Sequence, residues 1–541
     1  MRPKEPQNSD AHDLFRSRLD QIVDLGHPLA KLARVIDWDI LEASFGAVYT
    51  DAPGRPPLPT RLMAGLAILK HMHDLSDEAL CDRWVENPYY QLFCGEAFFQ
   101  HRLTFDRSSL TRWRQRMGEE KLTALVQESL ASATRVGAAK ASDFSKIIVD
   151  TTVQEKAVAF PTDARLAHKA RQRLVRLAKK HGIALRQSYE RVGKRMLIGH
   201  QRYAHAKQFK RAAKALRKLR TWLGRVERDI SRKIQNNIAL QDIFRRPLYL
   251  AERIRLQRPR QPGQKIYILH APEVECIGKG KAHRPYEFGV KVSVATSLHR
   301  SAGGQFVAHI KSQPGAPYDG HTLAALIPEM EEQLGTTINR IIADRGYRGH
   351  NAPSTHQFKV YIAGQKRRVT DAIRRELRRR PAIEPVIGHL KEDHRMGQNF
   401  LSHAAGDAIN AILAAAGYNF RRILAWLRLL CAWFMMLGSF KIAMRCSMIF
   451  LVYSACALTI GSFDLSAFFS RLEFISFSSC AISFFGSMAS LISAFNWSTA
   501  LRISFRLPRN PSIKPRTPFL TFVVAMSRLI PAESPIAPKK F

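Results

Sequence analysis

The sequence predicts a mixed α/β (α+β) protein: a sheet-forming core, interrupted by a long basic helical insertion and preceded by an all-helical region. Three observations carry this prediction. Apolar residues recur at helical spacing from about residue 12 to 140, and short β-branched runs follow them. Between two of these runs lie about a hundred residues of helical and strongly basic sequence. At 541 residues the chain is long enough for two to four domains with separate cores.

The N-terminal region, residues 1–140, contains helical segments with recognisable starts. Thr60 opens a segment with apolar residues at helical spacing, Ser76 can cap the next helix, and Ser109 can cap a third. Short arginine-rich helices joined by tight turns are compatible with a helix-turn-helix-like DNA-binding domain. They are equally compatible with a helical domain that only packs.

Short apolar runs predict the strands of the second region, residues 141–430. Residues 146–152 form a β-branched run, and we expect a buried strand with Asp150 at its tip. Residues 339–343 form a similar strand that ends in Asp344, and 286–312 and 359–363 also have strand character. We expect a helix from Arg374 to Leu390, which would carry Glu384 despite two prolines.

The insertion, at about residues 163–260, contains roughly 29 lysines and arginines against 6 acidic residues. The pair His181-Gly182 is expected to break its first helix. Six apolar residues then follow the 3–4 alternation of a helix seam, which predicts one face buried against a partner helix or a second subunit. They are Leu216, Leu219, Leu223, Val226, Ile230 and Ile234. So much charge of one sign would repel itself without phosphates to neutralise it.

The net charge of the whole chain points to a polyanionic partner. With 84 Lys+Arg against 45 Asp+Glu, the formal charge is +39. Such self-repulsion does not stabilise a fold, so nucleic acid is the first candidate partner and an anionic membrane surface the second. The seven cysteines are scattered without zinc-site spacing, which indicates reduced thiols rather than a disulfide framework. The first residues lack an apolar signal-peptide core, and we expect a cytoplasmic protein.

Residues 431–541 form an atypical tail rich in serine and phenylalanine. Residues 446–463 and 474–495 are nearly without charge and long enough for membrane spans, but they lack tidy flanking signals. Three interpretations remain open: membrane helices, a packed extra domain, or a tail that was never selected to fold. The third is our prediction, so we derive no function from this tail and regard a membrane partner as a rival only.

Two acids at strand ends and a third on a later helix are what a two-metal phosphoryl-transfer site requires. Mg²⁺ takes oxygen ligands and keeps several waters, so one or two carboxylates per ion are enough. Asp344 follows Asp150 by 194 residues and Glu384 follows Asp344 by 40. Two ions lie about 3.5–4 Å apart in such sites, so the three carboxyl groups must lie within about 10 Å of one another.

The sequence around these acids resembles that of IS5-type bacterial transposases, over roughly residues 15–430. The segments that carry the resemblance occur in the family's order. They are Val149-Asp-Thr-Thr-Val-Gln-Glu-Lys, Phe160-Pro-Thr-Asp-Ala-Arg-Leu, Tyr286-Glu-Phe-Gly-Val-Lys, Pro317-Tyr-Asp-Gly-His-Thr-Leu, Ala343-Asp-Arg-Gly-Tyr-Arg-Gly-His, Ile383-Glu-Pro-Val-Ile-Gly-His-Leu-Lys, Asn399-Phe-Leu and Gly406-Asp-Ala-Ile-Asn.

The resemblance implies an RNase H-like catalytic core with a DDE triad. Asp150, Asp344 and Glu384 would be both catalytic and metal-binding, with Mg²⁺ as the cofactor and Mn²⁺ able to replace it. The family signature Tyr-x2-Arg-x3-Glu-x6-Lys falls on Arg380, Glu384 and Lys391. Leu377 stands at the tyrosine position, which leaves any role of that tyrosine unsupported here.

Several residues around the triad are candidates for DNA binding. On one continuous helix, Arg380, Glu384 and Lys391 would share a face, with the two cations directed at the DNA backbone. Intrahelical salt bridges to Glu384 are the alternative. His389 is a candidate for DNA contact or for packing, and Arg345 and His350 for a phosphate contact or a turn. Glu155 and Asp163 lie near the first strand, and we interpret them as structural acids. Tyr318 and Asp319 are candidates for a loop that enters the site.

The resemblance implies metal-dependent cleavage at insertion-sequence ends and transfer of the freed 3′-hydroxyl into target DNA. The partners would be double-stranded DNA, as terminal inverted repeats and target, and further copies of the chain, since two ends must be joined by a dimer or larger assembly. The location would be the bacterial cytoplasm, in association with the nucleoid. Two alternatives are a catalytically inactive DNA-binding regulator or decayed copy, and a basic membrane-associated protein.

Overall fold

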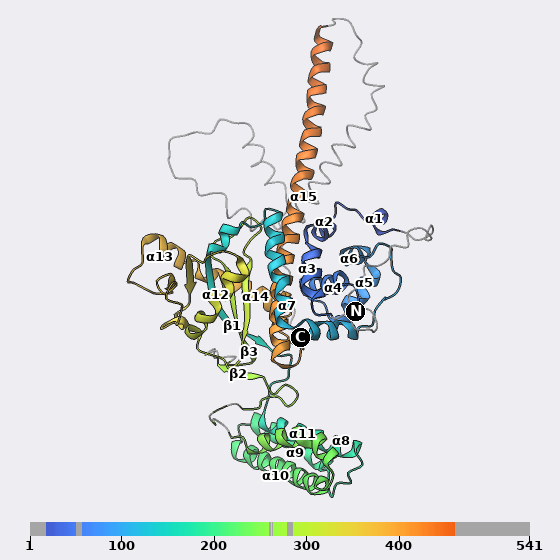
Figure 1. Ribbon diagram of the computed structural model, residues 1–541, viewed down its shortest axis with the longest axis vertical. Coiled ribbons are helices and arrows are strands. Elements are labelled where there is room, and N and C mark those ends of the chain that lie inside the picture. The colour runs from blue at the N-terminus through green and yellow to red at the C-terminus, as the bar shows by residue number, and fades with distance from the viewer. Residues whose placement is uncertain are drawn as a thin grey trace. The chain divides into compact units, whose positions relative to one another are not determined.

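The structure, a computed structural model, describes residues 18–49, 57–258, 261, 263, 265–278 and 285–459 (Figure 1). The chain divides into two compact units, Met1–Ser439 and Phe440–Phe541. Of the second unit only 440–459 are described, and they continue a long helix. No helix within the described ranges is long and apolar enough to cross a bilayer. Residues 474–495, the second stretch considered as a span, lie outside those ranges.

The N-terminal region is helical, as predicted. Its helices are α1 (Leu19–Ile22), α2 (Pro28–Val35), α3 (Trp38–Gly46), α4 (Thr60–Met72), α5 (Asp77–Glu86), α6 (Pro88–Phe93) and α7 (Ser108–Arg135). The start of α4 at Thr60 is confirmed, and the Ser76 side chain caps α5 by accepting the backbone N–H of Ala79. The predicted cap at Ser109 is wrong: α7 already begins at Ser108, whose N–H is bound by the side chain of Asp106.

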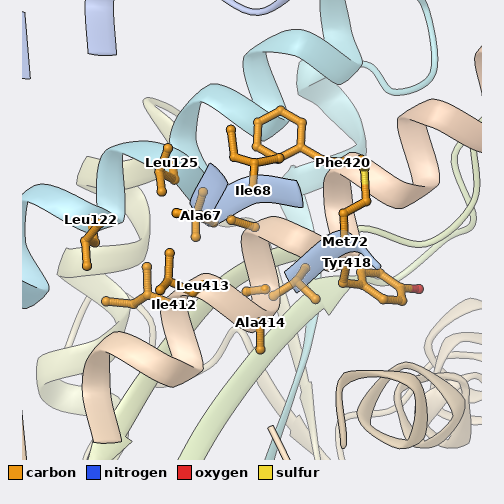
Figure 2. Packing of buried hydrophobic residues seen from close by; sticks show 14 of the residues in the cluster. Ala67, Ile68, Met72, Leu122, Leu125, Ile412, Leu413, Ala414, Tyr418 and Phe420 are labelled. Atoms are coloured by element: carbon orange, nitrogen blue, oxygen red, sulfur yellow. The ribbon is translucent and has the colours of Figure 1, made fainter. Parts of the chain in front are cut away.

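Helix α4 lies at the centre of the largest hydrophobic core. Every residue of α4 except Arg61 is buried. Figure 2 shows its side chains packed with those of α7 and α15 (His403–Thr459). The labelled residues are Ala67, Ile68, Met72, Leu122, Leu125, Ile412, Leu413, Ala414, Tyr418 and Phe420. The same core continues onto one face of the sheet through Ile148 and Val292. A helix enclosed on all sides has no face left for a DNA groove, so any groove contact must come from the other helices.

A mixed sheet follows the N-terminal helices. Its six strands are β1 (Lys146–Glu155), β2 (Glu275–Gly278), β3 (Tyr286–Ser297), β4 (Val307–Gln313), β5 (Arg340–Ala343) and β6 (Val360–Ile362). The order is β2-β3-β1-β5-β6, with β4 also paired to β3. Strand β1 is antiparallel to β3 and parallel to β5, and β5 is parallel to β6. The strands predicted at 286–312 and 359–363 are therefore confirmed.

The first strand is longer than the sequence indicated. Strand β1 runs to Glu155, so Asp150 lies inside it and not at its tip. The β-branched run ends at Val149, but Thr151, Thr152 and Val153 extend the strand because β3 pairs with it as far as Glu155. Only the parallel pairing with β5 stops at Val149. Asp150 is therefore the first residue of β1 beyond the end of its neighbour.

The segment that carries Glu384 is not one helix. Helix α13 (Asp371–Leu377) is followed by a 3₁₀ turn, η4 (Arg380–Ala382), and by α14 (Ile383–Asp393). The predicted continuous helix from 374 to 390 is thus wrong. Proline lacks an N–H and disfavours helical geometry in the residue before it, so Pro381 ends the first helix and occupies the first turn of η4. Pro385 is tolerated because it falls in the first turn of α14, where no N–H is needed.

Between β1 and β2, where the sequence predicts an insertion, the chain forms a bundle of four helices with its own core. They are α8 (Asp163–Lys180), α9 (Glu190–His205), α10 (Phe209–Ile234) and α11 (Ile238–Leu256), which lie side by side (Figure 1). The predicted seam is confirmed: five of its six residues are buried and Leu216 is partly buried, all against helices of this chain. The break after α8 is also confirmed, since Gly182 adopts a φ of +69°.

A buried polar network attaches α15 to the sheet. The Lys156 ammonium lies 2.6 Å from a carboxylate oxygen of Asp407, and the amide of Asn399 donates to the same oxygen. Gln154 donates to the Asp407 backbone carbonyl and accepts from Asn410. Three of the sequence segments that carried the family resemblance therefore meet here. Each buried polar group that finds a partner avoids a penalty of about 1–3 kcal/mol, so the network fixes how β1 and α15 pack.

Candidate functional site

Asp150 and Asp344 lie next to each other on neighbouring strands. Val149 of β1 pairs in parallel register with Ala343 of β5, and each is followed directly by one of the two aspartates. Adjacent strands lie about 4.8 Å apart, so this register alone brings the two carboxyl groups to the same edge. The Thr151 backbone N–H donates to the Asp150 carboxylate at 2.8 Å. The site is therefore built on sheet geometry and not on a mobile loop.

Glu384, in the first turn of α14, joins these two acids through Arg380. The Arg380 guanidinium lies 2.8 Å from Asp150, 3.3 Å from Asp344 and 2.7 Å from Glu384. Asp150 and Asp344 contact the same guanidinium nitrogen, Nη2. The carboxylate oxygens of Asp150 and Asp344 are therefore separated by at most the sum of these two distances. Three carboxyl groups that are 194 and 40 residues apart in sequence converge on one cation.

The position of Arg380 differs from its predicted DNA-facing role. Its side chain is only 16% exposed and points at the acids, whereas the side chain of Glu384 is 59% exposed. The break before α14 explains this, because Arg380 lies on η4 and turns toward Asp150, inside β1. The alternative weighed for this residue, a salt bridge to Glu384, is present, although it is not within one helix.

A fourth acid, Asp319, lies beside the site. Its carboxylate accepts hydrogen bonds from the Thr151 hydroxyl and the Lys291 ammonium, both at 2.9 Å. A Cβ at Gly346 would lie 2.9 Å from the same carboxylate, so the missing side chain allows the approach. The loop that contains Tyr318 and Asp319 therefore does reach the first strand. Lys291 was not singled out from the sequence, although it ends one of the segments that carried the resemblance.

The buried hydroxyl of Tyr347 lies close enough to these acids to be affected by their charges. Burial raises the pKa of Tyr347 well above its usual value, and the charges of Asp319, Asp150 and Asp344 act in the same direction. Tyr347 is fully buried in the 3₁₀ turn that directly follows Asp344. Its side chain belongs to the hydrophobic core on one side of the sheet, together with Val149 and Ala343. The pattern Asp-Arg-Gly-Tyr contained this residue, but nothing in the sequence indicated that it was buried.

The other candidate DNA-binding residues lie around these acids at different depths. Arg345 follows Asp344 directly and is exposed. His389 is exposed on α14 and lies 2.9 Å from Asp393, whose pKa it lowers through a hydrogen bond. The Lys391 ammonium is 3.9 Å from Glu287 and is largely covered. His350 accepts the backbone N–H of Ala352 at 3.4 Å, and burial lowers its pKa.

The two acids considered structural lie away from the Arg380 contacts. Asp163 pairs with Arg220 and Lys265, each at 3.2 Å, and so links α8 to α10 and to the segment that follows α11. Glu155 stands at the end of β1, where its backbone carbonyl accepts the N–H of Asn399. Asp163 is thus engaged in packing contacts of the insertion.

The donor chemistry of the site suits a hard divalent cation, since it offers carboxylate oxygens only. As the side chains stand, no group of three His, Cys, Asp or Glu residues in the described ranges is placed to hold a metal ion. The guanidinium of Arg380 occupies the space between the three acids. Asp344 and Glu384 are 44% and 59% exposed, so both carboxyl groups can be reached from solvent.

Comparison with known proteins identifies the N-terminal region. Residues 17–116 match a family model described as a transposase domain (DUF772). This range contains α1 to α6 and the start of α7. The match indicates a transposase-related protein without distinguishing the class of transposase.

A search of known proteins found one relative of this chain. A Rhizobium meliloti protein named "Uncharacterized protein ORF8 in nfe locus" is 52% identical over 209 residues, which are 100% of that protein and 39% of this chain. Its name assigns no activity. No solved structure matches the chain. Because the whole relative is covered at this identity, the chain belongs to the same family as the ORF8 protein of the nfe locus and carries at its N-terminus a region similar to DUF772 transposase domains.

Proposed function

We propose that the chain is a DDE-type transposase of the IS5 class. It cleaves DNA at the ends of an insertion sequence and joins the freed 3′-hydroxyl to target DNA. The observation that carries the proposal is the convergence of Asp150, Asp344 and Glu384 on the guanidinium of Arg380. Three acids that only solvate the surface are not expected to meet around one largely covered cation.

The strand order supports an RNase H-like core. Strand β3 pairs antiparallel with β1, β2 and β4, all of which precede β5 in the chain, and β5 and β6 then add in parallel beyond β1. One helix, α12 (Leu323–Leu334), connects the antiparallel part to the parallel part. We propose that this sheet and α14 form the catalytic domain within residues 141–430, and that α8–α11 form an insertion into it.

Asp150, Asp344 and Glu384 would hold Mg²⁺, or Mn²⁺ in its place. Bound there, the ions would activate the attacking oxygen and stabilise the leaving oxygen of a phosphodiester. The chain's own residues prepare this role. Thr151 fixes the Asp150 carboxylate, and the Lys291–Asp319 pair supports the loop beside it. Arg380 neutralises the acids in the DNA-free state and becomes available for a DNA phosphate when other cations replace it.

DNA binding near the acids would use the cations at the edge of the site. Arg345 is exposed directly beside Asp344, and His389 and Lys391 follow Glu384 on α14. Cations placed this way contact phosphates and position the duplex without reading its sequence. Because a transposase must hold two element ends at once, the active form would be a dimer or larger assembly.

A catalytically inactive DNA-binding regulator is the rival function, and the position of Arg380 among the acids favours it. A cleavage assay separates the two. The purified full chain is mixed with a labelled duplex that spans one end of the element encoding it, with Mg²⁺, Mn²⁺ or EDTA. We expect metal-dependent strand cleavage at the element end, absent with Asp150→Asn. Retarded but uncut DNA under all three conditions would establish the regulator and overturn the enzyme.

A further inference from the structure

The acids of the insertion are few, and most of them are paired. Of the six acidic residues of this bundle in the described ranges, five form ion pairs with its own lysines or arginines. Glu227 and Asp229 of α10 are buried, where they pair with Arg255 and Lys233. The pairs of Asp163 with Arg220 and of Glu227 with Arg255 join neighbouring helices, whereas Asp242 and Glu252 are exposed and pair within α11. The surplus of cations remains on the outside.

Six of the surplus cations are arranged in one row along α10. The row consists of Lys210, Lys214, Arg217, Arg225, Arg228 and Arg232, all exposed. Their spacing of four, three, eight, three and four residues keeps them on one side of a helix. The buried residues of α10, such as Leu219, Val226 and Ile230, lie on the opposite side and face the bundle core. The row is thus the outer face of the insertion's longest helix.

Few carboxylates approach this row. Arg232 lies 4.0 Å from Asp229, and Arg225 donates to the hydroxyl of Tyr189. Within the described part of the chain, five of the six cations have no carboxylate within ion-pair distance: Lys210, Lys214, Arg217, Arg225 and Arg228. Unneutralised cations at fixed spacing on a rigid helix cost free energy through mutual repulsion, and a polyanion removes that cost.

The dimensions of the row fit duplex DNA. From residue 210 to 232 a helix rises about 33 Å. A row of this length passes close to several successive phosphates of a duplex, which carries one charge per roughly 1.7 Å of axis. The side chains between the cations include Ala213 and Thr221 and no large apolar group. A helix that binds an anionic membrane needs such groups to enter the lipid, so the row favours DNA over a bilayer.

We propose that the cationic row of α10 is a second DNA-binding surface, formed by the insertion, that contacts duplex phosphates without reading sequence. The surface requires no divalent ion, and its residues are distinct from those around the acidic site. The choice of DNA as the partner rests on the proposed function. The test of this surface does not, because it measures DNA binding without cleavage.

The test is the salt dependence of DNA binding by the full chain in EDTA. A 30-bp labelled duplex is titrated at four salt concentrations, for the parent chain and for the triple variant Lys210→Gln, Lys214→Gln, Arg217→Gln. Each phosphate contact contributes about 0.9 to the slope of log K against log salt, so losing three contacts lowers the slope by about 2.7. The loss is expected to be equal on two unrelated sequences. The conservative variant Lys210→Arg, Lys214→Arg should keep the parent slope.

A matched control removes the same charge elsewhere in the bundle. Arg176, Lys179 and Lys180 are exposed on α8, outside the row. Their triple exchange to glutamine should leave the slope nearly unchanged. Equal losses from both triple variants would overturn the proposal in favour of diffuse basicity, and so would no loss from either. A row variant that loses binding only to vesicles of anionic lipid, and not to DNA, would overturn it in favour of a membrane. If the row binds DNA but the chain never cleaves it, the proposed function fails and this surface stands.

Discussion

The acidic site and the helical insertion use charge in opposite ways. At the acidic site, beside β1 and β5, one cation, Arg380, lies inside and three acids surround it. On α10 of the insertion the two acids, Glu227 and Asp229, lie inside, and the cations of the row are outside. Both regions leave their excess charge exposed to solvent. The sheet edge is thereby suited to attract cations, and the bundle to attract a polyanion.

The difference shows why net charge alone says little about a site. The +39 of the chain is consistent with DNA binding anywhere on its surface. A surface that binds phosphates exposes its positive charges, and a surface that binds metal ions exposes its negative charges. Which of the two a region is depends on which charges are buried and which are exposed. Either region can therefore be disabled without the other, and the following predictions use this independence.

The largest expected effect is the loss of cleavage in Asp150→Asn. We expect metal-dependent cleavage to fall by about a thousandfold or more, the upper range for the loss of one group that stabilises a transition state. DNA binding in EDTA should remain within twofold of the parent, because the cationic row is untouched. Cleavage rates and anisotropy titrations check the two parts. A comparable loss of both would mean that the two regions are not independent.

Asp77→Asn tests what happens when excess charge is buried instead of exposed. Asp77 binds Arg114 through two hydrogen bonds and Lys70 at 2.7 Å, between α4, α5 and α7. The variant leaves both cations without their acid, and we expect a loss of about 3–5 kcal/mol in the free energy of unfolding. Urea denaturation at pH 7 measures it. Asp82→Asn, which breaks the exposed pair with Arg107 on the same helix, should cost under about 1 kcal/mol.

The same pair gives a pH dependence with a definite sign. Burial raises the pKa of Asp77, but the hydrogen bonds and charges of Arg114 and Lys70 outweigh it and hold the pKa well below its usual value. The stabilisation is therefore complete above the unfolded-state pKa, near 4, and is lost as the pH falls below it. The difference in unfolding free energy between the parent and Asp77→Asn should shrink from pH 5 to pH 3. A difference that stays constant over this interval would contradict the assignment.

A smaller effect is expected from Arg380→Ala, which removes the internal cation of the acidic site. Without the guanidinium, three carboxylates are left to attract a divalent ion, and we expect Mn²⁺ to bind the DNA-free chain about tenfold more tightly, or about 1.4 kcal/mol. Isothermal titration calorimetry measures the affinity. The neighbouring exchange Arg379→Ala is the control, since Arg379 donates to the backbone carbonyl of Leu298. Unchanged or weaker Mn²⁺ binding would show that Arg380 does not compete with metal.

The smallest effect is expected from Arg345→Gln, at the exposed edge of the acidic site. One lost phosphate contact should lower the salt slope of DNA binding by about 1 and the affinity by a few fold, whatever the DNA sequence. Arg374→Gln is the control, because Arg374 is exposed but already paired with Asp371 on α13. If both variants bind DNA like the parent chain, the edge of the acidic site is not a phosphate contact.

Local patterns predicted most elements correctly because those elements depend on neighbouring residues. Thr60 and Ser76 started helices as expected, and the seam of α10 is buried as its spacing indicated. The pairing of Asp150 with Asp344 followed from two similar apolar runs, each ending in an acid. The domain boundaries and the chemical roles of the acids remain predictions, since fold alone does not establish them.

Long-range contacts decided what the sequence could not. Strand β1 continues past Asp150 because β3 pairs with it from about 140 residues away, a partner that no local window contains. The turn at Arg380 directs its guanidinium at the three acids, whereas a continuous helix would have pointed it outward.

By itself, the sequence determined the periodicities, the charge imbalance and the residue types that can bind metal or phosphate, because these properties are local and chemical. Only the tertiary structure decided which distant segments each element packs against. It thereby decided that Glu227 and Asp229 are buried beside cations and that the acids of the site surround a cation. The physical reason is that the cost of a charge depends on its depth and its partners, and both are set by packing between distant segments.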